Sequence, residues 1–560
     1  MFWVGLSIRG GGINSPRPAP QRAAALVLTA AMLTTFTAPA FAGTWYIEDG
    51  DITISAGESG NNVTQNENTT ENDPDTIITN REEGASSHTV TIDAKDKDDK
   101  VEVTLKDVNI DASSRSEAAV SVTGKGDTTI ELDGDNELQG GDRHAGLEHN
   151  QTVDSEGNVT SGKLTIQDDN DNAGSLTATG GYFGAGIGGG SAKAGQVTIT
   201  GGTITAISGD GAGIGGGQGN MGSNAGNADI EISGGTIEAT GGYTSAGIGG
   251  GYYGDATIKI TGDAVIKNAT GGTFGAGIGG GGGGNGDVTI SGNAKIENAQ
   301  GGYAGSGIGG GYGASGTVAI KDDSTVTATG GEVGAGIGGG VGGLADITIE
   351  GNATVNATGG ESSIDEESGE KIPGGAGIGS GAGDAKANIT LEGKVTIVAK
   401  AGEGNAAIGD MNGEQVFTGL DGSITRYDSE GNDTTLPTDP GHPVPVPASP
   451  SSSGGGSADA SVQESVFPGL VVTDKDGQRI SYTSIRGNNV LSLRVGRFTA
   501  SLHASLSTLR QLRAEGIDTI TFQTILCSTT LSVDELLAMG GEDAEAVLTH
   551  RFTASSLTVG

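Results

Sequence analysis

The sequence is poor in cysteine, in aromatic residues and in basic residues. Cys527 is the one cysteine among 560 residues, so no disulfide can form within the chain. Aromatic residues make up only 4% of the chain, which excludes a core built on large rings. Lys and Arg number 30 against 69 Asp and Glu, which gives a formal net charge of −39. A surface this negative repels nucleic acid and anionic lipid, so neither is an expected partner.

Long apolar runs are equally scarce. Residues 23–36 form a short apolar stretch that follows three arginines and precedes the small-residue motif Ala40-Phe41-Ala42. This order predicts a secretory signal peptide over residues 1–42, and hence an extracellular or cell-surface protein whose mature chain begins at Gly43. No other stretch is long and apolar enough to span a bilayer, so the mature chain is expected to have no membrane span.

Glycine, in contrast, is abundant and lies in a repeated motif. The chain contains 107 glycines, and the segment Gly-Ala-Gly-Ile-Gly-Gly-Gly at residues 184–190 is the first of a series of similar segments. The isoleucines at the centres of these segments are Ile187, Ile214, Ile248, Ile278, Ile308, Ile337, Ile378 and Ile408. They recur about every 30 residues, apart from one longer gap that holds a polar insert at residues 361–373. A period of this length is typical of solenoids and related repeat architectures.

Between successive glycine segments lie two short runs in which β-branched and polar residues alternate. Val197-Thr198-Ile199 and Thr203-Ile204-Thr205 are one such pair. This alternation predicts strands, and the glycine segment adds a third short strand to each repeat. We therefore expect an all-β fold, a right-handed parallel β-helix solenoid of about eleven coils over residues 43–430. Its core would consist of stacked columns of Ile and Val.

The remainder of the chain differs in composition. Residues 431–465 are rich in Pro and then in Ser and Gly, which predicts a linker. Residues 466–560 are expected to form a small α+β domain. Asp476-Gly477 between two β-rich runs predicts a hairpin. Leucines at helical spacing before Gly516, and a capping box that opens at Ser532, predict two short helices.

Three segments of the early repeats carry a resemblance to a known family. VEVTLKDVNI at residues 101–110, AAVSV at 118–122 and IELDGDNEL at 130–138 resemble the first coils of secreted bacterial carbohydrate-binding β-helix proteins. The Gly-Ala-Gly-Ile-Gly-Gly-Gly coils are similar to those of many surface proteins in that group. The family has a pectate-lyase-like fold and is regarded as binding acidic plant polysaccharide with calcium. The likeness covers residues 43–427 and concerns stacking residues, so it identifies no calcium ligand in this chain.

Carboxylates are the most abundant candidate ligands in the chain, and oxygen donors suit Ca²⁺. Calcium ions would also allow an acidic solenoid to bind an acidic polysaccharide that it would otherwise repel. The candidate metal ligands are Asp168, Asp169 and Asp171 in one oxygen-rich segment, and Asp107, Asp111 and Asp133 on neighbouring coils. The alternative is that the acidic residues only keep the surface solvated.

Three tyrosines share one position of the repeat. Tyr182, Tyr243 and Tyr303 each follow a Gly-Gly pair. Tyrosines raised by a glycine corner can stack on the faces of sugar rings, and ordinary corner packing is the alternative. These three are the predicted carbohydrate-binding residues. The expected partner is a polysaccharide or a cell-surface glycan, and the expected state is a monomer.

Most repeats lack the basic residues that catalysis on this fold would need. A polysaccharide lyase requires a base and a cation that stabilises the charge developing on the substrate. There is no Arg or His between Gly180 and Thr425. The early coils contain Arg81, Arg115, Arg143, His88, His144 and His149. The sequence therefore favours a non-enzymatic binder, with a structural stalk presenting the C-terminal domain and a lyase as the alternatives.

Overall fold

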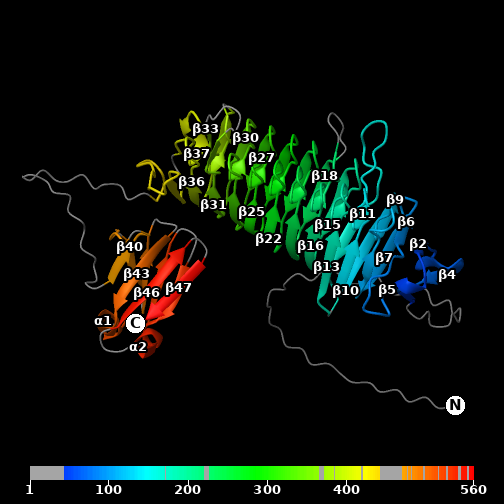
Figure 1. Cartoon of the computed structure of the whole chain (residues 1–560), viewed down its shortest axis with the longest axis horizontal. Helices are drawn as coiled ribbons and strands as arrows, with labels where there is room; N and C mark the ends of the chain where they lie inside the picture. The colour runs from blue at the N-terminus through cyan, green and yellow to red at the C-terminus, as the bar shows by residue number, and fades with distance from the viewer. Residues whose placement is uncertain are drawn as a thin grey trace, which may run out of the picture. The chain divides into compact units, whose positions relative to one another are not determined.

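The chain folds into a long solenoid followed by a small α+β domain (Figure 1). The computed structural model describes residues 43–170, 172–219, 226–364, 371–383, 385–417 and 420–441, and residues 470–559 apart from short gaps at 476, 481, 488, 496–498, 515, 525–527, 540–543 and 552–553. The predicted signal peptide and most of the predicted linker lie outside these ranges. No helix in the described ranges is long and apolar enough to cross a membrane.

Two of the three faces of the solenoid consist of strands that stack in parallel, one per coil. The first face contains β1 (Thr44–Tyr46), β5 (Thr76–Thr79), β7 (Lys100–Lys106), the start of β10 (Asp127–Gln139), β12 (Leu164–Gln167), β15 (Gly195–Ile199), β18 (Ala228–Ile232), β21 (Ala256–Ile260), β24 (Gly286–Ile290), β27 (Gly316–Ile320), β30 (Ala345–Ile349) and β35 (Ala387–Leu391). The second face contains β8 (Asn109–Asp111), the end of β10, β13 (Gly174–Thr179), β16 (Thr203–Ile207), β19 (Thr236–Thr240), β22 (Val265–Thr270), β25 (Lys295–Gln300), β28 (Thr325–Thr329), β31 (Thr354–Thr358), β36 (Thr396–Lys400) and β39 (Ser423–Tyr427). Because β10 belongs to both, the two faces form one 22-stranded sheet.

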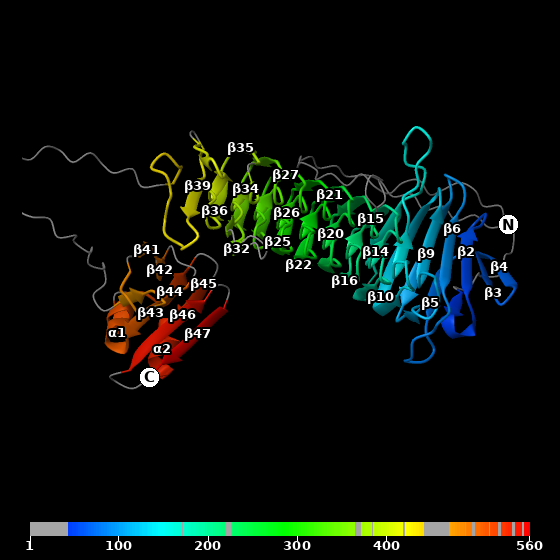
Figure 2. The same cartoon turned by 45° about the horizontal axis from the view of Figure 1, so that its top comes forward.

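The third face, here called the glycine face, is a separate 15-stranded sheet (Figure 2). Its parallel strands are β2 (Ile52–Ala56), β6 (Val90–Ala94), β9 (Val120–Gly124), β11 (Leu147–His149), β14 (Ile187–Gly188), β17 (Ile214–Gly215), β20 (Ile248–Gly249), β23 (Ile278–Gly279), β26 (Ile308–Gly309), β29 (Ile337–Gly338), β34 (Ile378–Gly379) and β37 (Ile408–Asp410). The antiparallel strands β3 (Asn61–Gln65), β4 (Asn68–Asp73) and β38 (Gly413–Glu414) extend it at its two ends.

The prediction of a parallel β-solenoid with three short strands per coil is confirmed, but the predicted number of coils is too low. Three of the fifteen strands on the glycine face are antiparallel, which leaves twelve parallel strands and at least twelve coils instead of eleven. The early coils were undercounted because they lack the Gly-Ile-Gly signature. In β6 and β9 the inward positions are occupied by Val90 and Val120, which pair with each other in register.

The core consists of aliphatic columns that run through successive coils. Ile278 is fully buried and pairs in register with Ile248 and Ile308 on the neighbouring coils. Columns on the other two faces are equally buried, and together they form one continuous cluster from Ile47 to Ile424. The hydrophobic effect of burying these columns is therefore the main source of stability in a chain without disulfides.

The last coil is closed by a buried ion pair. Arg426 on β39 occupies the core position that Ala399 fills one coil earlier, and its side chain is fully buried. Its guanidinium donates to both carboxylate oxygens of Asp439, at 2.7 and 2.9 Å, and also contacts Glu414. The backbone N–H of Ile424 donates to Pro440 O at 3.1 Å. Residues 431–440, assigned to the linker by their composition, are thus part of the end cap.

The C-terminal domain combines two four-stranded sheets with two helices. One sheet has the order β40 (Leu470–Thr473), β43 (Thr499–Ser505), β46 (Glu545–Arg551) and β47 (Ala554–Val559); the other has β41 (Thr483–Gly487), β42 (Val490–Arg494), β44 (Thr519–Gln523) and β45 (Ser528–Ser532). Both predicted helices are present, as α1 (Leu506–Ala514) and α2 (Val533–Met539). At the start of α2 the hydroxyl of Ser532 accepts a hydrogen bond from Glu535 N, as the capping box requires. A further short hairpin, β32 (Ser362–Ile364) and β33 (Lys371–Pro373), lies in the polar insert of the solenoid.

Candidate functional site

The glycine segments form a tight inward bend that no other residue can adopt. In the coil of β23 the backbone N–H of Ala276 donates to Gly280 O at 3.0 Å, so the chain folds back around Ile278. Gly279 has a φ of +140°, and a Cβ placed on it would lie 1.9 Å from Gly309 O. A side chain is therefore excluded both by the backbone conformation and by the neighbouring coil. This bend points the isoleucine into the core.

Two loops flank each bend and meet across neighbouring coils. We call the loop before the glycine strand the leading loop and the loop after it the trailing loop. In the leading loop of β23, Phe274 O accepts a hydrogen bond from Tyr312 N, at 2.8 Å, in the trailing loop of the next coil. One trailing residue, Gly282, donates to Thr244 O at 2.7 Å in the leading loop of the preceding coil. The paired loops thus stand side by side along the length of the glycine face.

Aromatic side chains collect on these paired loops. The ring of Phe274 packs edge-on against Tyr243 at a centroid distance of 5.7 Å and lies 5.5 Å from Tyr312. Tyr252 and Tyr253 pack against each other at 4.1 Å in another trailing loop. We call the whole set the aromatic row; its members are Tyr182, Phe183, Tyr243, Tyr252, Tyr253, Phe274, Tyr303 and Tyr312.

The three tyrosines singled out from the sequence all lie in leading loops with exposed rings. Tyr182 and Tyr243 are 61% and 60% exposed, and Tyr303 is 36% exposed with its hydroxyl 2.9 Å from Ser363 Oγ. Each is two coils from the next, which corresponds to about 10 Å along the solenoid. The sequence analysis missed Tyr252, Tyr253 and Tyr312, although Tyr252 and Tyr312 share one position of the repeat, directly after Gly-Ile-Gly-Gly-Gly.

One coil departs from the glycine motif and carries polar side chains in its place. In β11, Leu147 pairs with Ile187 of the next coil and Glu148 pairs with Gly188. Continuing this alignment, the sequence His144-Ala-Gly-Leu-Glu-His-Asn150 takes the place of Gly-Ala-Gly-Ile-Gly-Gly-Gly. Polar and ionisable groups therefore stand at positions where most of the later coils have glycine.

These side chains line a cavity of about 580 Å³ between the coils of β11 and β14. Its walls are formed by Arg143, His144, Glu148, Asn150, Phe183, Gly190, Ser191, Ala192, Lys193 and Gln218. We call this cavity the basic pocket. Phe183 also belongs to the aromatic row, and Arg143 lies over its ring at 5.4 Å. The pocket is thus adjacent to the Tyr182 end of the row.

Glu148 organises the pocket from a buried position. Its Oε2 lies 2.9 Å from His144 Nδ1 and accepts a hydrogen bond from Ala145 N at 3.2 Å. Its Oε1 accepts from Asn150 Nδ2 at 2.8 Å, while the carbonyl oxygen of the Asn150 side chain accepts from Gly190 N at 2.9 Å. The hydrogen bond that His144 donates to Glu148 raises the pKa of His144 against the opposing effect of burial, and the charges of Glu148, Glu117 and Asp142 raise it further. The imidazolium form of His144 is therefore favoured.

Two residues of the pocket have an unusual backbone conformation. Arg143 has a φ of +70° and Ala192 a φ of +57°, in the left-handed region that favours glycine. Such residues are uncommon and concentrate at functional sites. The backbone at Arg143 is held by its carbonyl oxygen, which accepts a hydrogen bond from Ser191 N at 2.7 Å.

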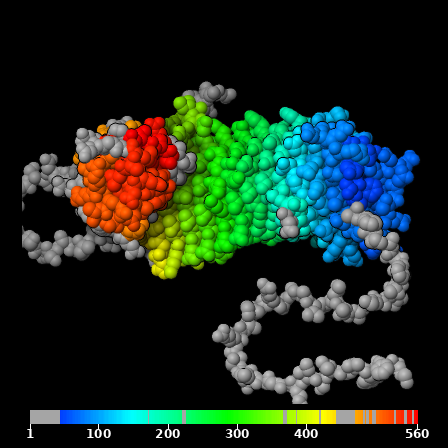
Figure 3. Space-filling model, turned by 90° about the horizontal axis from the view of Figure 1, so that it is seen from below, coloured from blue at the N-terminus to red at the C-terminus, as the bar shows by residue number. Residues whose placement is uncertain are grey.

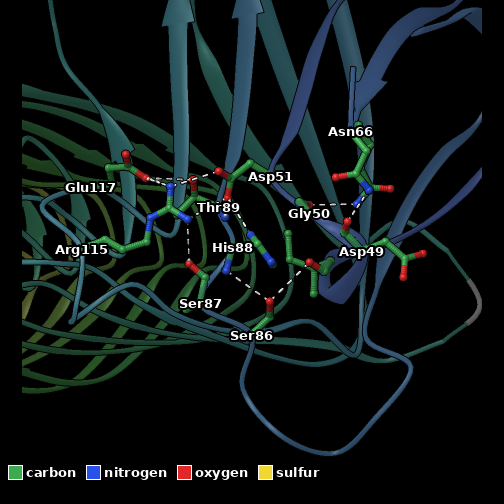
Figure 4. A network of polar contacts seen from close by, with 12 residues as sticks. Asp49, Gly50, Asp51, Asn66, Ser86, Ser87, His88, Thr89, Arg115 and Glu117 are labelled. Atoms are coloured by element: carbon green, nitrogen blue, oxygen red, sulfur yellow. Dashed lines mark hydrogen bonds and ion pairs between the residues drawn. The ribbon is translucent and has the colours of Figure 1, made fainter. Parts of the chain in front are cut away.

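The other basic residues of the early coils are used in ion pairs or packing. Arg115 makes two hydrogen bonds to Asp51, at 2.9 and 3.0 Å, and His88 lies 3.2 Å from the same carboxylate (Figure 4). Arg81 is held by both oxygens of Asp49 at 2.9 Å. His149 is buried, with Nδ1 2.8 Å from Gln196 O. Among the six candidates from the sequence, Arg143 and His144 are those that line the pocket.

The predicted calcium ligands are not brought together. Asp107 Oδ1 accepts from Asp135 N at 3.1 Å, Asp111 Oδ1 accepts from Ser113 N at 2.9 Å, and Asp133 is paired with Lys106 at 2.7 Å. In the described ranges no three His, Cys, Asp or Glu side chains are grouped as a metal site, so the arrangement of this trio gives no support to a shared calcium ion. Each carboxylate has a different partner within the protein: Asp107 accepts from the next coil, Asp111 caps its own turn and Asp133 pairs with a lysine.

The remaining candidates, Asp168, Asp169 and Asp171, can be followed only in part. Asp171 lies outside the described residues. The backbone N–H of Asp169 donates to Glu131 Oε1 at 2.9 Å, and Asp168 Oδ1 is buried without a hydrogen-bond partner. The carboxylates of Asp168 and Asp169 alone form no closed set of ligands.

Comparisons with known proteins support the repeat. A family model described as a beta helix repeat matches residues 172–191, 197–218, 230–252 and 318–341. Neither the search of curated proteins nor the search of solved structures returned a match. The repeat is thus similar to β-helix repeats, and the matched ranges contain half of the aromatic row, namely Tyr182, Phe183, Tyr243 and Tyr252.

Proposed function

We propose that the solenoid binds an extended polysaccharide along the aromatic row, without cleaving it, at the cell surface or outside the cell. The observation that carries this proposal is the exposure of Tyr182, Tyr243 and Tyr312 in a chain that has few aromatic residues. An exposed ring is costly in water unless a partner covers it, and the faces of sugar rings are suitable partners.

The spacing of the row supports a linear ligand. Tyr182, Tyr243 and Tyr303 repeat every second coil, about 10 Å apart, and this distance is comparable with the length of a disaccharide unit in an extended chain. A rigid solenoid holds these rings in fixed register, which lowers the entropy lost on binding. A stalk with no ligand would have no need of such a register.

Calcium enters this proposal as a bridging ion. A net charge of −39 repels an acidic glycan, and a divalent cation shared between protein and glycan carboxylates removes that repulsion. A shared ion needs fewer protein ligands than an ion held by the protein alone. Binding of acidic and neutral polysaccharides should therefore be compared with Ca²⁺ and with a chelator.

The test of the aromatic row is a set of substitutions on intact protein, with affinity electrophoresis against a panel of soluble polysaccharides. Tyr243→Ala and Tyr312→Ala should each weaken binding by about fivefold, since a stacked ring contributes about 1 kcal/mol. Tyr243→Phe keeps the ring and should bind as the parent does. Val153→Ala removes an exposed apolar side chain outside the row and serves as the control.

Binding by the parent that is unaffected by both alanine substitutions would contradict this function, and so would an absence of binding to every polysaccharide in the panel. The latter result would favour a structural stalk. Release of unsaturated, ultraviolet-absorbing product from a polyuronate would instead indicate a lyase. We expect no such product, because the hydrogen bond to Glu148 raises the pKa of His144 and so lowers the fraction of neutral imidazole that could act as a general base.

A further inference from the structure

The basic pocket is a local concentration of positive charge in a strongly acidic chain. Arg143, His144 and Lys193 line one cavity, whereas Asp and Glu outnumber Lys and Arg by 69 to 30 in the whole sequence. Phe183 forms an apolar wall beside them. A cavity that combines three nitrogen cations with an aromatic wall is suited to an anionic substituent on a carbon ring.

The cations of the pocket are available to a ligand. Arg143 is 67% exposed, and its nearest carboxylate, Asp142, is 3.8 Å away with a side chain that is itself 61% exposed. This contrasts with Arg115, whose guanidinium is held by Asp51 and Glu117. Lys193 lies within ion-pair distance of no carboxylate in the described ranges. Two of the three charges are thus not committed to a tight partner.

Glu148 does not cancel this availability, because its oxygens are already occupied. Hydrogen bonds from Ala145 N and Asn150, together with the contact to His144, account for both carboxylate oxygens, and the side chain is only 8% exposed. Glu148 therefore acts as a positioning residue. It fixes the imidazole ring through Nδ1 and leaves Nε2 as the remaining donor of His144.

We propose that the basic pocket binds an oxyanion, a carboxylate or sulfate group carried by a sugar, through Arg143, His144 and Lys193. This inference rests on the proposed function, because it places a binding site for a charged sugar residue at the Tyr182 end of the aromatic row. The oxyanion accepts from the guanidinium, the imidazolium and the ammonium group, while the sugar ring packs on Phe183. Recognition at this site is direct and requires no calcium ion.

The site makes binding depend on pH. The groups that face His144 are Arg143, Lys193 and Glu148 in the pocket, with Glu117 and Asp142 close by. We assign the pH dependence to His144, because imidazole is the side chain whose ordinary pKa lies nearest to neutrality. Its pKa is raised above the ordinary value of 6.5, and affinity for an oxyanion should fall as the pH rises through that raised value.

The experiment uses calorimetric titration of the intact protein in the presence of chelator. The probes are a uronic acid oligosaccharide, the same oligosaccharide with its carboxylates reduced to hydroxymethyl groups, and a sulfated oligosaccharide of matched length. The variants are Arg143→Gln, Lys193→Gln and His144→Asn. Lys267→Gln, which removes an exposed positive charge from β22 on the second face, is the matched control.

We expect the parent to bind one of the charged probes more tightly than the reduced probe, and the preferred probe identifies carboxylate or sulfate as the ligand. Arg143→Gln and Lys193→Gln should each lose about tenfold in affinity for that probe, as the loss of a charge-assisted hydrogen bond implies. His144→Asn should abolish the pH dependence. Lys267→Gln should behave as the parent.

Equal affinity of the parent for charged and reduced probes would overturn the pocket proposal, and so would pocket variants that bind the charged probe as the parent does. In either case, binding of the reduced probe that is still weakened by Tyr243→Ala would leave the aromatic row intact as the proposed function. An absence of binding of the parent to any probe in chelator would contradict the pocket proposal, and an absence that persists when Ca²⁺ is supplied would contradict both proposals. Thermal melting of each variant separates loss of the site from loss of the fold.

Discussion

Two large buried polar side chains of the solenoid, His149 and Arg426, lie where the repeat is interrupted. His149 takes a glycine position in the coil of β11 and is 2% exposed, while Arg426 takes an alanine position in β39 and is fully buried. Each has a hydrogen-bond partner: the histidine contacts Gln196 O on β15 of the next coil, and the arginine contacts Asp439 in the end cap. A buried polar group without such a partner costs several kcal/mol, so both residues are sensitive points of the fold.

His149 should make the solenoid unstable in acid. Burial lowers its pKa below the ordinary value of 6.5, so below that pH the unfolded chain takes up a proton that the folded chain does not. The free energy of unfolding should fall with decreasing pH by at most about 1.4 kcal/mol per unit for this residue. We expect this part of the pH dependence to disappear in His149→Gln, measured by denaturant titration over a pH series.

His144 provides a control, because its effect on the free energy of unfolding should change with pH in the opposite direction. Because its pKa is raised above 6.5, it contributes stability below that pH, and the contribution is lost as the pH rises through the raised value. His144→Gln should therefore remove stability on the acid side. If the free energy of unfolding of the parent and that of His149→Gln depend on pH in the same way below pH 6.5, the prediction for His149 is contradicted.

Arg426 and Asp439 should be strongly coupled. Replacing Arg426 by Met leaves the fully buried carboxylate of Asp439 without its partner and should lower the free energy of unfolding by about 3–5 kcal/mol. The double variant Arg426→Met with Asp439→Leu removes both charges and should recover most of that loss. Additive losses in the two single variants, measured as melting curves in a double-mutant cycle, would show that the ion pair is not the contact that closes the last coil.

At the scale of secondary-structure elements, the strands and the core columns could be predicted from the sequence because each follows from a local pattern. Alternating β-branched residues gave the strands of the first two faces, and the spaced isoleucines gave the column on the glycine face. The early coils were undercounted since Val90 and Val120 replace the recognisable motif. The contact between leading and trailing loops was not predictable from the sequence. Phe274 and Tyr312 are joined by a backbone hydrogen bond between coils, and no sequence pattern marks the two residues as neighbours.

The basic pocket shows a second limit of sequence reading. The broken motif at His144-Ala-Gly-Leu-Glu-His-Asn150 can be recognised in the sequence, and the structure places His144 in the lining of the pocket. Lys193 and Phe183, however, belong to the next coil and have no recognisable motif of their own. Their place beside Arg143 follows from the stacking register of β11 on β14, which the sequence does not specify at the level of side chains.

The glycine bend gives a prediction for the element as a whole. Gly279→Ala places a Cβ 1.9 Å from Gly309 O at a φ of +140°, so we expect a loss of several kcal/mol and opening of the coils on either side. Hydrogen exchange should report faster exchange in β23 and β26 than in distant coils. Gly84→Ala, where a Cβ would meet no atom within 4 Å, is the matched control and should exchange as the parent does. A parent-like exchange pattern for Gly279→Ala would mean that the bend tolerates a side chain.

For the whole molecule, the distribution of charge is the main constraint on function. The solenoid presents its coils as one uninterrupted surface (Figure 3), and its acidic residues recur on successive coils. On the first face, Asp229, Asp287 and Asp346 are each separated by a threonine of the intervening coil. This alternation keeps like charges about 10 Å apart and so limits their repulsion. The basic pocket differs from this acidic surface, because Arg143, His144 and Lys193 line it.

Stabilisation by screening of this charge can be distinguished from stabilisation by specific calcium binding. With a net charge of −39, any salt should raise the melting temperature, and the rise should depend on ionic strength. Ca²⁺ bound to the folded state would add a further increase, about 2.7 kcal/mol at a hundredfold excess over the dissociation constant. CaCl₂ and NaCl at equal ionic strength should therefore be compared by calorimetry.

We expect the two salts to stabilise the protein equally when no glycan is present, because the described ranges group no three metal-ligating side chains and a bridging ion needs the glycan as its second partner. A triple variant, Asp168→Asn with Asp169→Asn and Asp171→Asn, tests the one candidate segment that extends beyond the described residues. An additional stabilisation by Ca²⁺ in the parent that disappears in the triple variant would contradict this expectation and place a resident calcium ion at that segment. If the additional stabilisation survives the triple variant, the ion is held elsewhere, and the acidic columns of the first face become the next residues to replace.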